Sequence, residues 1–185
     1  MLGSTVKNKP EDKKEVVMKV VYLTSGPRGS GKTEFVKKIA SFHPEVEVIS
    51  RDGILIELFS STSLNPYEGG HYVAKDILWK KVEEFLSSSK KRELILDCWN
   101  GFSNERQVII WKLRELGADR VVCWQFMVPI DLCVQWFFTK PDSKGYSEIG
   151  IRRDYNLYYE MAKDIEEDGF DEIYHINPCQ LILNL

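Results

Sequence analysis

One segment constrains this chain more than any other, the run Gly26-Pro27-Arg28-Gly29-Ser30-Gly31-Lys32-Thr33. It fits the pattern G-x-x-x-x-G-K-[ST] without a mismatch, and it joins an apolar, β-rich run (16–24) to an amphipathic segment (32–42). A phosphate-binding loop needs this arrangement, because glycines let backbone N–H groups surround phosphates at the N-terminus of a helix. The pattern therefore predicts a nucleoside triphosphate site between a strand and a helix. A glycine-rich turn that matches by chance is the alternative.

The residues of this loop have separate expected roles. The backbone from Gly26 to Thr33 surrounds the phosphates, and the Lys32 ammonium adds a full positive charge to the β- and γ-phosphates. The Thr33 hydroxyl is expected to ligate Mg²⁺. ATP and Mg²⁺ are thus the predicted cofactors.

The remaining apolar patterns alternate between short and long periods. Strands are expected at 16–24, 46–49, 94–97, 121–128 and 173–176, and helices at 32–42, 54–59, 71–87, from a Ser103 cap to Gly117, near 131–138 and at 147–166. This alternation predicts a three-layer α/β/α fold with a mostly parallel five-stranded sheet, the fold class of P-loop NTPases of the kinase type. Ligands of such sheets bind at the carboxyl ends of the strands.

Composition narrows the possibilities. The 185 residues suit one domain (15–185) after a polar tail (1–14), with a hydrophobic content of 43% and a charged content of 29%. No apolar run approaches the roughly 20 residues of a membrane span. A net charge of −3 disfavours extensive non-specific binding to duplex nucleic acid. Scattered cysteines and histidines predict reduced thiols, no zinc site and a cytoplasmic location.

Two carboxylates follow strands at the expected ligand-binding edge. Asp52 could accept the proton of an acceptor hydroxyl, although capping of the helix 53–59 is an alternative role. Asp97 closes an apolar strand, as a Walker B acid does, and could support Mg²⁺ or the acceptor. The two aspartates could also exchange these roles. Trp99 and Asn100 follow on the acceptor side, where the aromatic ring could stack on a base or fold back onto the core.

A loop with basic residues lies near the C-terminal end of the predicted fold. Lys140 and Lys144, followed by Arg152 and Arg153, belong to a predicted lid at about 136–153, whose cations would neutralise charge on the transferred phosphoryl group. A solvated loop is the alternative. Thr139-Lys140-Pro141-Asp142 also resembles the guanine-reading [NT]-K-x-D motif, but the residues before it look helical and the companion D-x-x-G is missing.

Across about residues 16–178 the pattern resembles the 5′-polynucleotide kinase family of P-loop phosphotransferases. Arg51-Asp52 resembles the family's R-D, whose aspartate is the general base. Asp97 with Asn104-Glu105-Arg106 resembles its D-[TS]-N…P-E-R segment, and Cys133–Lys140 with Ile149–Met161 resembles its lid. Three positions differ: Trp136-Phe137 replaces the lid's R-N, Lys140 its later arginine, and Leu55 the arginine that binds the acceptor phosphate.

The resemblance implies an ATP-dependent kinase that phosphorylates the 5′-hydroxyl of DNA or RNA. It implies that Lys32, Asp52, Lys140 and Arg153 act in catalysis, that Arg51, Asp52, Asp97, Trp99 and Asn100 bind the acceptor, and that Asn177 borders the adenine. Leu55 and the acidic pI of 5.7 favour a second hypothesis, a kinase for a nucleoside, sugar or other metabolite. A third is a nucleotide-binding switch or ATPase without an acceptor, in which Asp52 would be only a cap.

Overall fold

A computed structural model describes residues 18–62, 69–87, 91–98, 100–140 and 143–179. Strands and helices alternate along it: β1 (Val20–Ser25), α1 (Lys32–Phe42), β2 (Glu47–Ser50), α2 (Arg51–Phe59), α3 (Gly70–Ser87), β3 (Glu93–Asp97), α4 (Ser103–Glu115), β4 (Arg120–Phe126), α5 (Ile130–Phe138), α6 (Glu148–Met161), the 3₁₀ helix η3 (Ile165–Glu167) and β5 (Glu172–Ile176). The strands form one sheet in the order β2-β3-β1-β4-β5. Every neighbouring pair is parallel, which confirms the predicted α/β architecture.

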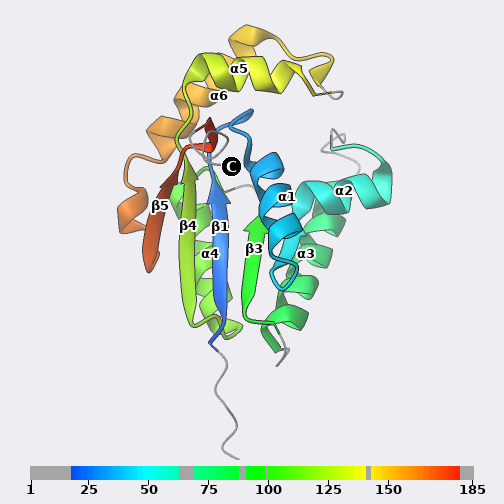
Figure 1. The fold of residues 1–185 in the computed structure, drawn as a ribbon, viewed down its shortest axis with the longest axis vertical. Helices are drawn as coiled ribbons and strands as arrows, with labels where there is room; N and C mark the ends of the chain where they lie inside the picture. Colours follow the sequence, from blue (N-terminus) through cyan, green and yellow to red (C-terminus); the bar gives the residue numbers. More distant parts are fainter. Residues whose placement is uncertain (1–17, 63–68, 88–90, 99, 141–142, 180–185) are drawn as a thin grey trace, which may run out of the picture.

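Helices cover both faces of this sheet, as parallel strands require. Successive side chains of β1 point to opposite faces of the sheet. Val21 and Leu23 therefore lie in the core with α3 and α4, and Tyr22 lies on the opposite face. All strands point toward the end of the sheet where α5 and α6 lie (Figure 1). The loop after β1 lies at that same end, so the topology brings the predicted phosphate-binding loop and the predicted lid together.

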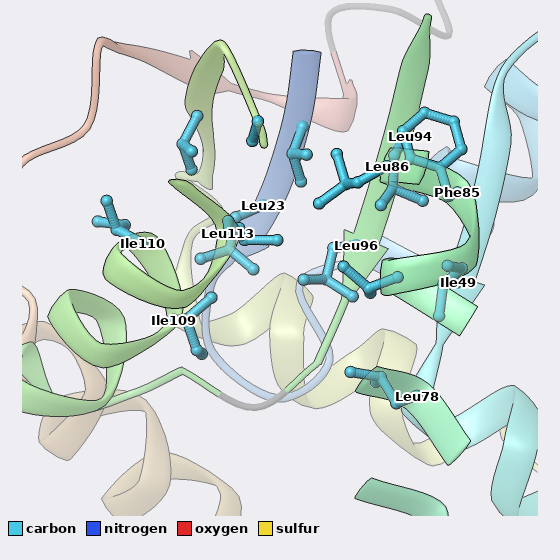
Figure 2. Packing of buried hydrophobic residues seen from close by; sticks show 14 of the residues in the cluster. Leu23, Ile49, Leu78, Phe85, Leu86, Leu94, Leu96, Ile109, Ile110 and Leu113 are labelled. Atoms are coloured by element: carbon cyan, nitrogen blue, oxygen red, sulfur yellow. The ribbon is translucent and has the colours of Figure 1, made fainter. Parts of the chain in front are cut away.

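The main core lies between the sheet and the α3–α4 side. Leu23 of β1 and Leu94 and Leu96 of β3 are completely buried there, beside Leu113 of α4 (Figure 2). Full burial of a leucine side chain stabilises a fold by roughly 1.5–3 kcal/mol. This packing fixes the position of β3, and with it the aspartate at the end of that strand.

The opposite face is packed by aromatic rings. Phe35 of α1 makes edge-to-face contacts with Trp124 and Phe126 of β4, at ring-centroid distances of 5.5 and 5.3 Å. Trp124 also stacks on Tyr22 of β1 at 4.7 Å. These contacts hold α1, and therefore the residues at its N-terminus, against the two central strands.

Two predicted helix ends were wrong. Ser103 does not cap α4: it is the first helical residue and its hydroxyl donates to Asp168, whereas Phe102 is the cap and its N–H donates to the Glu105 carboxylate at 3.2 Å. The helix expected over 147–166 ends at Met161 and is followed by η3. Asp168 beyond η3 is needed for an ion pair with α4, which a continuous helix would not deliver. The local periodicity of residues 147–166 does not reveal that the helix must end early for this ion pair to form.

Other predictions concern features outside the sheet. The tail 1–14 lies outside the described residues. Among the helices that the structure describes, none combines the length and apolarity needed to cross a bilayer. All four cysteines are free thiols, as the sequence predicts.

Candidate functional site

A cavity opens at the carboxyl ends of the strands, where the sequence places the ligand. The phosphate-binding loop forms one wall of it, through Gly26 and residues 28–33. The first turn of α2, directly after β2, contributes Asp52, and the end of β3 contributes Asp97. The segment between α5 and α6 contributes Lys140. The described residues thus bring the loop, both predicted acids and one predicted lid cation into a single cavity.

Two glycines of the loop have a left-handed backbone, with φ of 79° at Gly29 and 81° at Gly31. Gly31 is the N-terminal cap of α1. Gly29 meets a second constraint, because a Cβ atom there would lie 2.2 Å from the carbonyl oxygen of Cys133 in α5. The loop therefore needs glycine at position 29 both for its turn and for the close approach of α5.

Lys32 lies inside the curve of the loop. Its ammonium donates to the carbonyl oxygens of Gly26 at 2.8 Å and Pro27 at 3.0 Å, and to the Ser30 hydroxyl at 3.4 Å. Desolvation lowers the pKa of Lys32 to about 8; nearby Asp97 opposes this shift and Lys140 reinforces it. Both opposite and like charges therefore act on this ammonium across the cavity.

Asp97 is fixed by a short chain of hydrogen bonds from neighbouring segments. The Thr24 hydroxyl of β1 donates to the Asp97 carboxylate at 2.6 Å. The Asn100 amide in turn donates to the backbone carbonyls of Thr24 at 2.7 Å and Cys98 at 2.9 Å. Asn100 lines the cavity but is only 4% exposed, so its amide holds the loop after β3 in place. Trp99 lies outside the described residues.

The same loop is held from below by a buried arginine for which the sequence indicated no role. Arg106 of α4 is completely buried and forms an ion pair with Asp168. Its guanidinium also donates to the carbonyls of Asn100 and Gly101, and to Met161 at the end of α6 at 3.0 Å. The only sequence signal was its place in the Asn104-Glu105-Arg106 segment. Local patterns do not predict that an arginine is buried when its helix also has exposed faces.

Asp52 does not cap α2. Ser50 is the cap, because its hydroxyl accepts a hydrogen bond from the Gly53 N–H at 3.3 Å. Asp52 lies in the first turn with an exposed carboxylate on the cavity, 3.1 Å from the Arg51 guanidinium. Capping therefore does not account for this acid. Leu55, where the resembling family has a cation, is completely buried in the core.

The predicted lid residues divide into two groups. Lys140 lines the cavity, whereas Arg153 lies outside it with an 80% exposed side chain, 3.8 Å from Asp154. Arg152 is paired with Asp131 and Glu148, each at 2.8 Å. Residues 130–138 form α5, so Thr139 and Lys140 follow a helix, whereas a guanine-reading motif should follow a strand.

The predicted adenine border lies beside the loop but outside the cavity. The Asn177 side chain accepts a hydrogen bond from the Cys179 N–H at 3.1 Å. Its neighbour Pro178 and the indole of Trp136 both approach Gly31, at 3.8 and 3.3 Å from where a Cβ would lie. Asn177 and Arg153 therefore stay predictions as site residues.

Arg28 has a side-chain environment that the loop pattern does not predict. The guanidinium carbon lies 4.8 Å from the ring centroid of Tyr146 and 5.7 Å from that of Phe137. Its Nε lies 3.6 Å from the Asp154 carboxylate of α6. The third residue of the phosphate-binding loop is thus in contact with the α5–α6 segment.

Oxygen ligands suited to Mg²⁺ are present in the cavity. The Thr33 hydroxyl and the Asp97 carboxylate both line it, and the described residues contain no cluster of three or more metal-binding His, Cys, Asp or Glu side chains. Mg²⁺ in phosphotransfer sites takes one or two protein ligands and completes its shell with water and substrate phosphates. The donor set therefore fits this ion.

Comparison with known proteins gives a fold. No model of a protein family matches the sequence, and no curated protein does. Solved structures similar to it include a chain of the Pnkp1/Rnl/Hen1 RNA repair complex (TM-score 0.61, 15% identity, 83% of this chain and 48% of that one). Others are a chain of the PezAT toxin–antitoxin system of Streptococcus pneumoniae (0.65, 15%, 92% and 72%) and shikimate kinase from Acinetobacter baumannii in complex with shikimate (0.55, 18%, 91% and 94%).

These likenesses identify the P-loop kinase fold. This chain spans about half (48%) of the length of the RNA-repair chain, and 40% of the chain in a second structure of that complex. The expected fold class, a three-layer α/β/α arrangement around a parallel sheet, is confirmed.

Proposed function

We propose that this chain is an ATP-dependent phosphotransferase that moves the γ-phosphate to an acceptor hydroxyl. The observation that carries the proposal is the shared cavity of Lys32, Asp52 and Asp97. The three groups are close enough that both carboxylates oppose the desolvation that lowers the pKa of the Lys32 ammonium. A triphosphate beside Lys32 therefore has an exposed carboxylate, Asp52, on the acceptor side.

The chain's own residues would divide the work as follows. The loop amides and Lys32 bind the β- and γ-phosphates. Thr33 and Asp97 would hold Mg²⁺, which would neutralise phosphate charge when bound. Asp52 accepts the proton of the acceptor hydroxyl while the oxygen of that hydroxyl bonds to the γ-phosphorus. The bond from that phosphorus to the β–γ bridging oxygen breaks, and ADP leaves. Lys140, with Arg153 after closure of the predicted lid, stabilises the transferring group.

The 5′-hydroxyl of a polynucleotide is the proposed acceptor. Arg51-Asp52 after β2 resembles the catalytic dipeptide of the 5′-polynucleotide kinases, and it lies on the cavity as that role requires. The RNA repair complex among the similar structures supports the same acceptor class.

A small metabolite is the second candidate, and the position of Leu55 favours it. This side chain is completely buried where the resembling family has a cation for the acceptor phosphate. Arg51, the cation beside Asp52 on the described cavity wall, is paired with Asp52 itself. A neutral hydroxyl substrate needs no further cation there.

The test is transfer of label from γ-labelled ATP, with Mg²⁺, to 5′-OH DNA and RNA oligonucleotides and to a panel of nucleosides, sugars and hydroxy acids. Asp52→Asn should slow transfer by roughly 10²- to 10⁴-fold while ATP binding is retained, because only proton acceptance is lost. Glu57→Gln is the matched control: it neutralises an exposed acid on the same helix and should leave the rate unchanged.

The outcomes separate the hypotheses. Labelled oligonucleotide supports the polynucleotide acceptor, and labelled metabolite alone replaces it with the second candidate. ATP binding with no labelled product and equal hydrolysis in the wild type and Asp52→Asn would overturn the transferase proposal in favour of a nucleotide switch.

A further inference from the structure

The Arg28 side chain joins the phosphate-binding loop to the α5–α6 segment through three contacts. It lies over the rings of Phe137 and Tyr146, which pack edge to face at 5.1 Å, and its Nε faces Asp154 at 3.6 Å. The rings come from the end of α5 and from the loop that follows it, and Asp154 from α6. One guanidinium thus contacts α5, the loop that follows it and α6.

These contacts are loose. The Arg28 and Asp154 side chains are 41% and 34% exposed, and their separation of 3.6 Å exceeds that of a good charge-assisted hydrogen bond. Ion pairs of this kind contribute between zero and about 1 kcal/mol, and a cation–π contact at a half-exposed site contributes about as much. An incoming group with more negative charge would therefore compete well for this guanidinium.

Such a group is expected next to Arg28. The residue is third in a loop whose backbone surrounds phosphates, and it lines the same cavity as Lys32. An arginine fork matches phosphate oxygens in a bidentate way, which gives a stronger pair than a carboxylate at 3.6 Å.

We propose that Asp154 and the nucleotide triphosphate are alternative partners of the Arg28 guanidinium, so that phosphate binding breaks the ionic contact between the loop and α6. The proposal rests on the nucleotide site of the proposed function and adds to it a side-chain ligand and a competitor. The Asp154 carboxylate also lies 3.8 Å from the Arg153 guanidinium. When Arg28 binds phosphate, Arg153 is therefore the partner that Asp154 keeps among these contacts. The small apolar cluster of Val134, Phe137 and Ile151 joins α5 to α6 independently of this ion pair.

A double-mutant cycle tests this competition. The dissociation constants of Mg·ATP and of adenosine are measured by calorimetry for the full chain and for Arg28→Gln, Asp154→Asn and the double variant. Arg28→Gln should weaken Mg·ATP roughly tenfold, the value of a charge-assisted hydrogen bond, and Asp154→Asn should tighten it roughly two- to fivefold. In the Arg28→Gln background, Asp154→Asn should have no effect. Adenosine, which lacks phosphates, should bind all four proteins equally.

Asp131→Asn is the matched control. It removes an exposed carboxylate that pairs with an arginine of α6, Arg152, at 2.8 Å, and among the ion pairs of the described residues none joins it to the loop. Its Mg·ATP affinity should equal that of the wild type.

Each other outcome is decisive. If Asp154→Asn tightens Mg·ATP equally with and without Arg28, the effect is general electrostatics and the competition is refuted. Equal Mg·ATP binding by the wild type and a folded Arg28→Gln refutes it too, while leaving the transferase proposal intact. No Mg·ATP binding by the wild type would remove both.

Discussion

Two arginines beside the same cavity each face an aspartate, and they do so in opposite ways. Arg106 and Asp168 are both completely buried and in close contact, and the guanidinium donates to three backbone carbonyls as well. Arg28 and Asp154 are half-exposed, 3.6 Å apart, and supplemented by two aromatic rings. The first pair holds the loop after β3, and the second holds the α5–α6 segment.

The difference shows which parts of the site are fixed. A buried ion pair cannot be broken cheaply, because each charge would be left without water or a partner. The wall formed by the loop after β3 is therefore rigid, as the proposed role of Asp97 as a metal ligand requires. A half-exposed pair exchanges partners at little cost, since water replaces what is lost. We therefore expect the wall toward α5 and α6 to move more readily than the first wall when ligands bind.

The largest effect should come from breaking the buried pair. Arg106→Ala leaves the Asp168 carboxylate buried without its partner and should lower the free energy of unfolding by about 3–5 kcal/mol in urea denaturation. Arg114→Ala is the matched control, because Arg114 lies on the same helix and pairs with Asp171 at 3.1 Å, but at an exposed site. It should cost less than about 1 kcal/mol. Equal losses for the two variants would contradict the division into a rigid and a movable wall.

The next effect concerns the contact between the loop and α5. Gly29→Ala adds a Cβ that meets the Cys133 carbonyl oxygen at 2.2 Å, on a backbone with φ of 79°. The clash and the strained backbone together should cost roughly 2–4 kcal/mol of stability and weaken ATP binding. Gly145→Ala, with φ of 91° and no atom within 4 Å, should cost only the backbone part, about 1–2 kcal/mol. Thermal denaturation of both variants checks this, and similar shifts would mean that α5 yields to the added methyl group.

The smallest expected effect is the pH dependence of ATP affinity, which is due to Lys32 in the cavity between the two walls. The pKa of Lys32 is lowered to about 8 by desolvation, so the ammonium loses its proton above that pH and ATP affinity should fall, by up to about tenfold per pH unit. Calorimetry between pH 7 and 9.5 measures this. Lys32→Arg stays charged and should abolish the dependence; if the slope persists in that variant, another group titrates.

The same shift has a defined sign for stability. Between about pH 8 and the ordinary lysine value of 10.5, the unfolded chain keeps a proton on residue 32 that the folded chain has released. The contribution of Lys32 to the free energy of unfolding therefore rises with pH across this window.

Sequence reasoning worked where chemistry is local. The loop from Gly26 to Thr33 contains its own turn residues and its own helix start, and both Asp52 and Asp97 follow directly from strand ends, so their common cavity is a consequence of parallel topology. The side chain of Arg28 is different. Its partners, Tyr146 and Asp154, lie more than a hundred residues away, and no periodicity relates them.

Arg106 is another feature that the sequence did not provide. From the helix pattern alone we expect Arg106 to be an exposed charged residue, because arginine is seldom buried unless it is paired. Its burial depends on Asp168, which reaches it only because α6 ends at Met161 and the chain turns through η3. The error at that helix end and the missed ion pair have the same cause.

The hydrogen bonds from Arg106 to main-chain oxygens have a consequence for any attempt to change the proposed acceptor of this protein. Because the guanidinium binds the carbonyl groups of residues 100 and 101, an exposed side chain that follows them can vary without disturbing these hydrogen bonds. Phe102, which is 47% exposed at the start of α4, is one such position. Libraries that diversify it should yield folded proteins at high frequency, which makes this turn a practical starting point for altering the acceptor of the proposed phosphotransferase.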